Sequence, residues 1–160
     1  MCAGGGYVTS AAVADRRIKA VATASARQQY AATGRATHVP FLADGELDVW
    51  RENAKSFYLT DRNQDPHWRN ETLLWSYDKT LQFAAVDTVE LLTPTPILIV
   101  AGDQAETLDQ SKAAFEAANE PKELLLLPGG THFDLYDRPE YPEYVGPAID
   151  RINAFFTNHL

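Results

Sequence analysis

Two short apolar runs separated by a helical segment constrain the fold of this chain more than any other feature. The first run is ILIVA at 97–101, which ends in a Gly-Asp pair, and the second is ELLLL at 123–127, which ends in Pro-Gly-Gly. Runs of this length without polar alternation are typical of parallel strands buried on both faces. Residues 109–119 between them mix charged residues with alanine and predict a helix. Strand, helix and strand form a βαβ unit, so we expect a parallel sheet covered by helices.

The regions on either side of this unit extend the same pattern. IKAVATA at 18–24 is short and apolar and predicts a third buried strand. Residues 1–6 are dense in glycine and predict a turn, and 7–14 predict a short helix after it. Residues 144–159 place apolar side chains at helical spacing and predict a final amphipathic helix packed on the sheet. The expected fold class is α/β, with three parallel strands and flanking helices.

The segment from 27 to 93 has a different character. Its aromatic residues are interleaved with polar ones, and no strand is obvious in it. We expect helices near 46–58 and 70–82, the second capped by Asn70, with a turn-rich stretch at 61–67 between them. The segment therefore predicts a helical, lid-like excursion whose aromatic residues either fill a core or line a pocket. The domain prediction is one α/β domain over 1–160 with this excursion inside it.

Composition excludes several classes of function. The chain has 160 residues, a hydrophobic fraction of 45% and a net charge of -8, which fits one globular domain that nucleic acid and anionic membranes repel. Apolar runs are too short for a membrane span. One cysteine excludes an intrachain disulfide and makes a reducing cytoplasm the simplest compartment. The four histidines show no zinc spacing and no phosphate-binding loop is present, so we expect neither metal nor cofactor.

Three sequence features carry chemistry. Cys2 stands directly before the glycine turn that opens a helix, where the helix dipole favours a thiolate and backbone N–H groups, starting with that of Ala3, are placed to hold an oxyanion. Asp103 and Glu106 follow the buried strand at 97–101 and offer carboxylates at the end of the sheet. His132 stands on a Gly-Gly-Thr-His loop after the next strand. The order is nucleophile, acid and base.

These motifs resemble the α/β-hydrolase superfamily and, within it, the dienelactone-hydrolase-like branch, whose nucleophile turn often reads Gly-x-Cys-x-Gly-Gly. The resemblance covers most of the chain. Its most specific part is the block EPKELLLLPGGTHFDLYDRPEY, in which a strand, Pro-Gly-Gly-Thr-His and an aromatic and acidic tail occur together. The other parts are CAGGGY near the start with RIKAVATAS after it, and PILIVAGDQAET before the last block.

The resemblance implies a role for each of these residues. Cys2 would be the nucleophile, His132 the general base, and either Glu106 or Asp103 the carboxylate that orients the histidine. The implied reaction is hydrolysis of a small carboxylic ester, thioester or lactone. The choice between the two acids stays open, since Glu106 lies where relatives tend to place a charged residue and Asp103 is nearer the strand.

The start of the chain departs from the family pattern. Members of the family carry further strands, a small residue two positions before the nucleophile and an earlier oxyanion donor, all upstream of Met1. We therefore expect either a fragment or a chain whose missing N-terminal half comes from a partner, and an exposed strand edge at 18–24 that favours a homo-oligomer. The alternative function is a catalytically inactive fragment or association module that retains the fold.

Overall fold

The computed structural model describes residues 10–15, 17–24, 38–42, 49–63, 65–73, 76, 83–136 and 142–160. The chain divides into two compact units. Unit 1 combines Met1–Gln28 with Ala84–Leu160, and unit 2 is Gln29–Phe83.

Unit 1 is built on a parallel sheet of three strands, in the order β1-β4-β5. The strands are β1 (Val21–Ala24), β4 (Ile97–Gly102) and β5 (Lys122–Leu127), with Val21 opposite Ile97 and Ile97 opposite Lys122. The predicted fold class, with three parallel strands and flanking helices, is confirmed. Strand β1 starts at Val21 rather than at the predicted residue 18, because residues 18–20 connect the preceding helical residues 10–14 to the sheet.

Strand β4 is the centre of the sheet, and all six of its residues are buried. Side chains alternate between the two faces of a strand. Ile97 and Ile99 therefore lie in one hydrophobic cluster, and Leu98 and Val100 lie in the other. Burial on both faces is the reason that this strand reads as a continuous apolar run.

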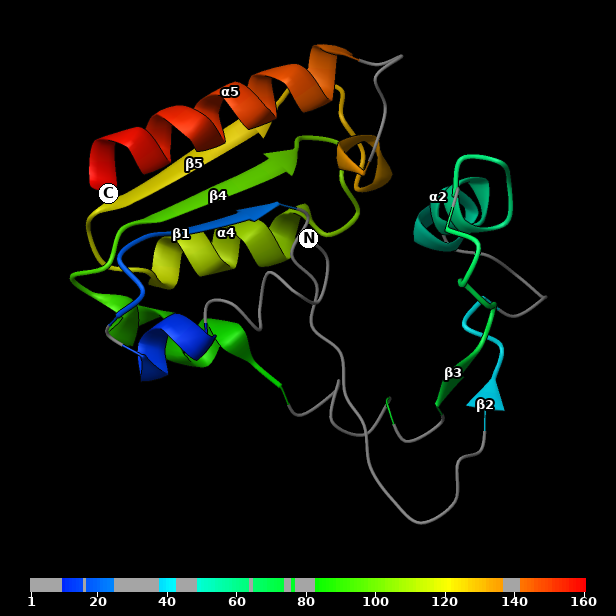
Figure 1. Ribbon diagram of the computed structural model, residues 1–160, viewed down its shortest axis with the longest axis horizontal. Coiled ribbons are helices and arrows are strands. Elements are labelled where there is room, and N and C mark those ends of the chain that lie inside the picture. The colour runs from blue at the N-terminus through cyan, green and yellow to red at the C-terminus, as the bar shows by residue number, and fades with distance from the viewer. Residues whose placement is uncertain are drawn as a thin grey trace. The chain divides into compact units, whose positions relative to one another are not determined.

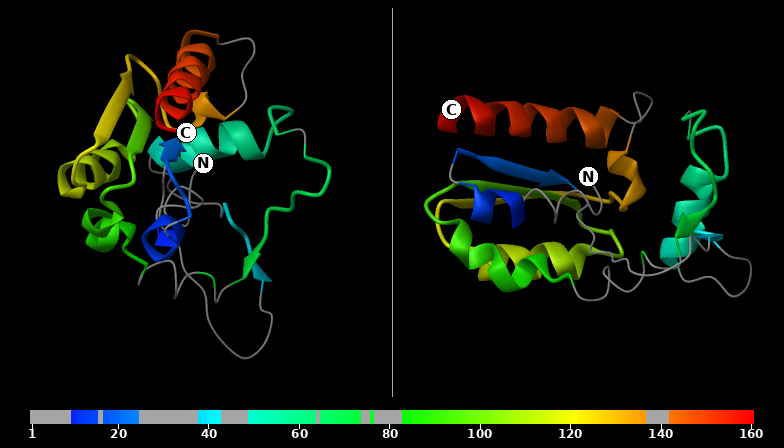
Figure 2. Two further views of the ribbon diagram at one scale, coloured as in Figure 1. Left: turned by 60° about the vertical axis from the view of Figure 1, so that its left-hand side comes forward. Right: turned by 60° about the horizontal axis from the view of Figure 1, so that its bottom comes forward.

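Helices cover both faces of the sheet, as Figures 1 and 2 show. On one face lie α4 (Leu108–Ala117), the 3-10 helix η1 (Ala85–Leu92) and the helical residues 10–14. On the other face lies α5 (Pro142–His159). A short 3-10 helix, η2 (Phe133–Leu135), follows β5 at the carboxyl end of the strands.

Each face has its own core. The first cluster joins the sheet to α4, η1 and the helical residues at 10–14, and its buried members are Ala12, Val21, Val89, Leu92, Ile97, Ile99 and Ala118. The second cluster joins the sheet to η2 and α5, and its buried members are Leu98, Val100, Leu127, Leu135, Ala148 and Phe155. Helix η1 falls inside the predicted excursion at 27–93, yet it packs in the first core because Val89 and Leu92 are buried there.

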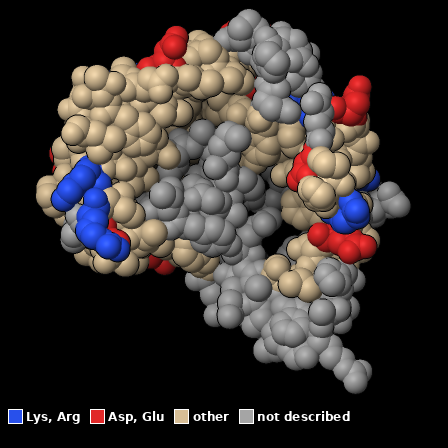
Figure 3. Space-filling model, in the orientation of Figure 1, with Lys and Arg blue, Asp and Glu red and all other residues tan. Residues whose placement is uncertain are grey.

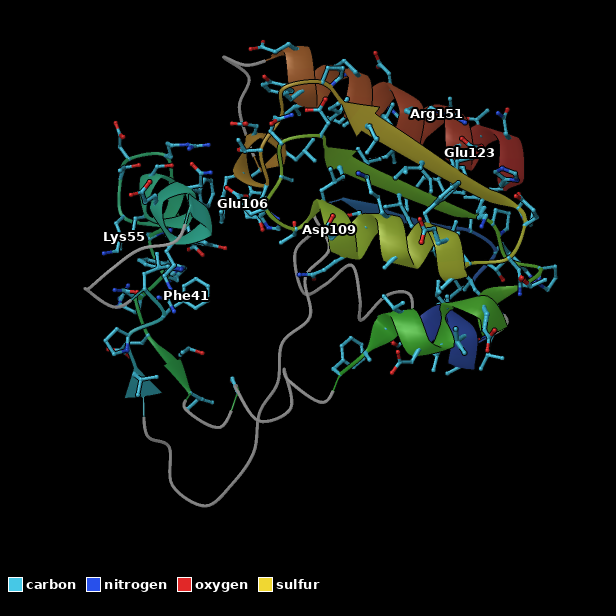
Figure 4. All side chains as sticks on the ribbon, turned by 180° about the vertical axis from the view of Figure 1, so that it is seen from behind. Phe41, Lys55, Glu106, Asp109, Glu123 and Arg151 are labelled. Atoms are coloured by element: carbon cyan, nitrogen blue, oxygen red, sulfur yellow. The ribbon has the colours of Figure 1, made fainter. Side chains whose placement is uncertain are left out.

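Polar contacts fasten the helices to the sheet. The ammonium group of Lys122 on β5 donates to the carbonyl of Phe115 near the end of α4 (2.8 Å) and lies 4.7 Å from the centroid of the Phe115 ring. On the opposite face, Arg151 of α5 forms an ion pair with Glu123 of β5, and Figure 4 shows the two side chains directed toward each other.

Unit 2 contains α2 (Val49–Tyr58) and a two-stranded antiparallel sheet of β2 (His38–Val39) and β3 (Thr72–Leu73). Its described side chains include an aromatic cluster in which the rings of Tyr58 and Trp68 stack with centroids 5.4 Å apart. The ring of Phe41 meets that of Tyr58 edge to face, with centroids 5.5 Å apart.

The two helices predicted in this segment have different outcomes. The helix predicted at 46–58 corresponds to α2. The helix predicted at 70–82 does not begin as expected, because residues 72–73 form β3. Asn70 is not a helix cap: its side chain accepts from the N–H of Leu42 (2.8 Å) and donates to the carbonyl of Leu42 (3.0 Å), as a strand partner would. Apart from Ser76, residues 74–82 lie outside the described part.

Charged side chains of the described residues are spread over the surface rather than gathered in one patch on the face that Figure 3 shows. Among the described residues, none of the helices has the length and apolarity needed to cross a membrane.

Candidate active site

The candidate site forms where β4 and β5 end side by side. Gly102, the last residue of β4, is paired in register with Leu127, the last residue of β5. The loops that follow the two strands therefore start at the same edge of the sheet. In parallel α/β sheets the carboxyl ends of the strands are where ligands bind.

Backbone contacts hold these two loops together. The N–H of Asp103 donates to the carbonyl of Leu127 (3.0 Å), and the N–H of Gln104 donates to the carbonyl of Gly130 (3.0 Å). The approach is so close that a Cβ on Gly102 would lie 2.0 Å from the Gly130 oxygen. Glycine is therefore required at the end of β4, which explains the Gly-Asp pair that closes the apolar run in the sequence.

Asp103 stabilises the turn after β5. Its Oδ1 accepts from the backbone N–H of Gly129 (2.8 Å) and from Nε2 of Gln104 (3.0 Å). Gly129 has a φ of 78°, a left-handed conformation that glycine adopts without a steric penalty. These contacts give the Asp103 carboxylate a structural function in the loop that carries the histidine.

His132 is fully buried, with 0% exposure. Its Nδ1 lies 2.7 Å from the hydroxyl of Thr107, the residue directly before α4. Its Nε2 lies 3.0 Å from the hydroxyl of Tyr136, four residues further along the same loop. The ring is thus held at both nitrogens by hydroxyl groups, and the ring of Phe133 packs against it with centroids 4.9 Å apart.

Asp134 stabilises the backbone at the histidine. Its Oδ2 accepts from both the N–H (2.8 Å) and the hydroxyl (2.7 Å) of Thr131. These two hydrogen bonds stabilise the turn formed by residues 131–134, which contains His132. The position of His132 is therefore fixed by its own loop as well as by the loop after β4.

Glu106 lies on the loop that joins β4 to α4, next to Thr107, and Figure 4 shows it near the start of α4, where Asp109 also lies. The residue is partly exposed, but its Oε2 is buried. Asp103, Glu106 and His132 thus all lie at the carboxyl end of the sheet. Cys2 and Ala3, the predicted nucleophile and oxyanion donor, lie outside the described residues.

The sequence did not single out Thr107 and Tyr136, which contact the histidine, or Asp134, which holds its loop. Each carries a weak local signal: Thr107 follows a predicted acid, and Tyr136 and Asp134 lie within four residues of His132. Hydroxyl and carboxyl residues of this kind are common in loops, so the signal alone does not distinguish them. Within the described ranges, no group of three or more histidine, cysteine, aspartate or glutamate side chains is arranged to hold a metal ion.

Comparison with known proteins shows the fold to which this arrangement belongs. No protein-family model matches the chain. The structure superimposes on the α/β hydrolase GrgF from Penicillium with a TM-score of 0.78 and 21% identity, over 99% of this chain and 62% of that one. This chain has an α/β-hydrolase fold.

Two bacterial proteins are similar in sequence. PA2218 of Pseudomonas aeruginosa, an uncharacterized protein, is 36% identical over 107 residues, which are 65% of this chain and 28% of that protein. Its crystal structure matches with a TM-score of 0.79 and 27% identity over 99% of this chain and 59% of that one. YcjY of Escherichia coli, also uncharacterized, is 28% identical over all of this chain and 62% of its own length. The chain thus spans about three fifths of the length of the PA2218 crystal structure, of YcjY and of GrgF.

Proposed function

We propose that the chain belongs to a hydrolase that cleaves carboxylic esters, thioesters or lactones through Cys2, His132 and a carboxylate. The observation that carries the proposal is the buried, doubly hydrogen-bonded His132 on the loop after β5, in a chain with an α/β-hydrolase fold. A base needs a fixed ring in order to transfer protons efficiently. The cysteine in the glycine-rich start favours the dienelactone-hydrolase-like branch of the superfamily.

In the proposed reaction the Cys2 sulfur attacks the carbonyl carbon while His132 takes up the thiol proton. Backbone N–H groups, starting with that of Ala3, stabilise the oxyanion. The bond to the leaving group then breaks, His132 returns the proton to the leaving oxygen or sulfur, and Cys2 keeps the acyl group as a thioester. Water, deprotonated by His132, hydrolyses this thioester and regenerates the thiol.

The carboxylate of the proposed triad is better assigned to Glu106 than to Asp103. Oδ1 of Asp103 is engaged by Gly129 and Gln104 in the turn after β5. Glu106 immediately precedes Thr107, whose hydroxyl contacts Nδ1 of the histidine. Glu106 is therefore the acid whose neighbour in sequence contacts the ring, and its negative charge would stabilise the imidazolium.

The proposal is tested by acyl transfer to Cys2. The full chain is mixed with p-nitrophenyl acetate, and its intact mass is followed with time. We expect one acetyl group on Cys2, none in Cys2→Ala, and acylation slowed by about 100-fold or more in His132→Gln, which is the usual contribution of a general base. His67→Gln, at an exposed position of unit 2, is the matched control and should behave as the unaltered chain. Acylation that is equally fast in His132→Gln would contradict the proposal.

A second candidate role, self-association, is favoured by the edge position of β1. Among the described strands β1 pairs only with β4. The N–H of Val21 donates toward β4, to the carbonyl of Pro96 (3.0 Å), so the N–H of Ala22 points to the outer edge. Such an edge is a template for strand addition by a second copy.

The edge hypothesis is tested with Ala22→Pro, which removes the outward donor but leaves the pairing with β4 intact. Light scattering after size exclusion should show a dimer of the 17.7 kDa chain that Ala22→Pro converts to a monomer. A monomeric unaltered chain at high concentration would exclude this role.

A further inference from the structure

We infer that the hydroxyls of Thr107 and Tyr136 are positioning groups that together place the proton of the neutral His132 ring on Nδ1 and so keep Nε2 as the proton acceptor. The inference rests on the proposed function, because it concerns the base of that reaction. Thr107 and His132 are both buried, with 6% and 0% exposure, and their contact is short at 2.7 Å.

The chemistry of the two hydroxyl groups decides which nitrogen carries the proton. A neutral imidazole has one N–H donor and one lone-pair acceptor, so one hydroxyl must donate to the ring and the other must accept from it. A phenol, with a pKa of about 10, is a stronger acid than the aliphatic alcohol of threonine and is therefore the better donor. Tyr136 then donates to the lone pair of Nε2, and Nδ1–H donates to Thr107.

Burial supports the same assignment. The contact between Thr107 and Nδ1 is buried, whereas the contact between Tyr136 and Nε2 is only partly buried. A group that exchanges protons with a thiol or a leaving group must be reached from the less buried side. Nε2 is the ring nitrogen whose partner, Tyr136, is only partly buried, so it is the one that has to hold a lone pair in the resting state.

The backbone around Thr107 is well anchored for this role. Its carbonyl accepts from the N–H groups of Gln110 (3.2 Å) and Ser111 (3.4 Å) in the first turn of α4. A positioning hydroxyl on a helix terminus is held more rigidly than one within a loop. Because threonine is uncharged, it fixes the orientation and the proton of the ring without supplying the negative charge that a triad carboxylate contributes.

The test is the protonation pattern of the His132 ring nitrogens, measured by long-range ¹H–¹⁵N correlation NMR on the full chain at neutral pH. Signals are assigned by their loss in His132→Gln. The unaltered chain should show protonated Nδ1 and unprotonated Nε2. Thr107→Val, which keeps the shape but removes the acceptor, should lose this single pattern and gain the form protonated at Nε2. Thr107→Ser should retain protonated Nδ1, whereas Tyr136→Phe, which removes the donor to Nε2, should weaken the preference for this form.

A proton on Nε2 in the unaltered chain, or an unchanged pattern in Thr107→Val, would overturn the inference. If Thr107→Val fails to fold, as judged by its backbone amide spectrum, Tyr136→Phe decides: an unchanged pattern in this variant would contradict the inference. The measurement needs no substrate and no cysteine. Failed acylation of Cys2 would therefore refute the proposed function without affecting the NMR measurement on His132. A different protonation pattern of His132 would refute this inference without affecting the acylation experiment.

Discussion

The absence of a Cβ atom at Gly102 allows the backbone of Gly130 to approach closely, and this approach determines the geometry of the site. A side chain at Gly102 would meet the carbonyl oxygen of Gly130 at 2.0 Å, and this oxygen belongs to backbone that holds the histidine loop. The loops after β4 and β5 can share hydrogen bonds only because this space is empty. The short distance between the two strand ends is thus set by the absence of a Cβ.

Gly102→Ala should therefore destabilise the fold strongly, by about 3 kcal/mol or more, because backbone rather than a flexible side chain must move. The measurement is the free energy of unfolding in urea. Gly146→Ala is the matched control, since a Cβ there meets nothing within 4 Å, and it should change stability by no more than about 1 kcal/mol. Equal effects of the two substitutions would show that the strand ends do not approach as described.

The charge pair of Asp15 and Arg17 gives a prediction about pH. Hydrogen bonds from Arg17, including one of 2.6 Å, hold the pKa of the Asp15 carboxyl below its ordinary value. The interaction stabilises the folded chain above the ordinary pKa of aspartate and is lost as pH falls through the lowered value. In Arg17→Gln the pKa of Asp15, measured by NMR titration, should return toward its ordinary value. An unchanged pKa would contradict the contact.

At the scale of the element, the strands could be predicted from sequence and several helical features could not. Buried parallel strands leave a continuous apolar signal, and β4 and β5 lie within one residue of the predicted ranges. The 3-10 helix η1 has no such signal, because its packing is decided by contacts with α4 and the sheet. Strand β3 was predicted as helix because a strand of two residues, paired with His38 and Val39 of β2, leaves no periodicity in the sequence.

The end of α4 depends on Lys122, whose ammonium group donates to the carbonyls of Phe115 (2.8 Å) and Glu116 (3.4 Å). A cation at a helix C-terminus also interacts favourably with the helix dipole. Lys122→Met, which keeps the apolar stem, should lower the free energy of unfolding by about 1 kcal/mol. Lys112→Met on the exposed side of the same helix is the control and should have little effect. Two variants of equal stability would contradict the capping role.

At the scale of the whole molecule, the hydrophobic clusters of the sheet are built from unit 1, to which every residue in them belongs. We therefore predict that replacing residues 29–83 with a glycine-serine linker of about 15 residues leaves the sheet folded. Circular dichroism should retain a cooperative thermal transition. A variant without such a transition would show that unit 2 is needed for the fold.

The candidate site was only partly predictable from sequence. The position of Asp103, Glu106 and His132 at one edge of the sheet could be predicted, because parallel strands end at the same edge. The contacts of each residue could not be predicted, because the sequence does not show that Asp103 accepts from the N–H of Gly129 or that the Thr107 hydroxyl contacts the His132 ring. Contacts between the loops depend on the distance between the carboxyl ends of β4 and β5. The sequence of either loop alone does not predict this distance.

The central claim is that His132 acts on the Cys2 sulfur, and the pH dependence of Cys2 alkylation by iodoacetamide tests it most directly. In the unaltered chain and in His67→Gln, the rate should stay high well below pH 8.5, the approximate pKa of an unperturbed thiol, and in His132→Gln it should fall with a midpoint near that value. The same midpoint near 8.5 in all three proteins would contradict the account.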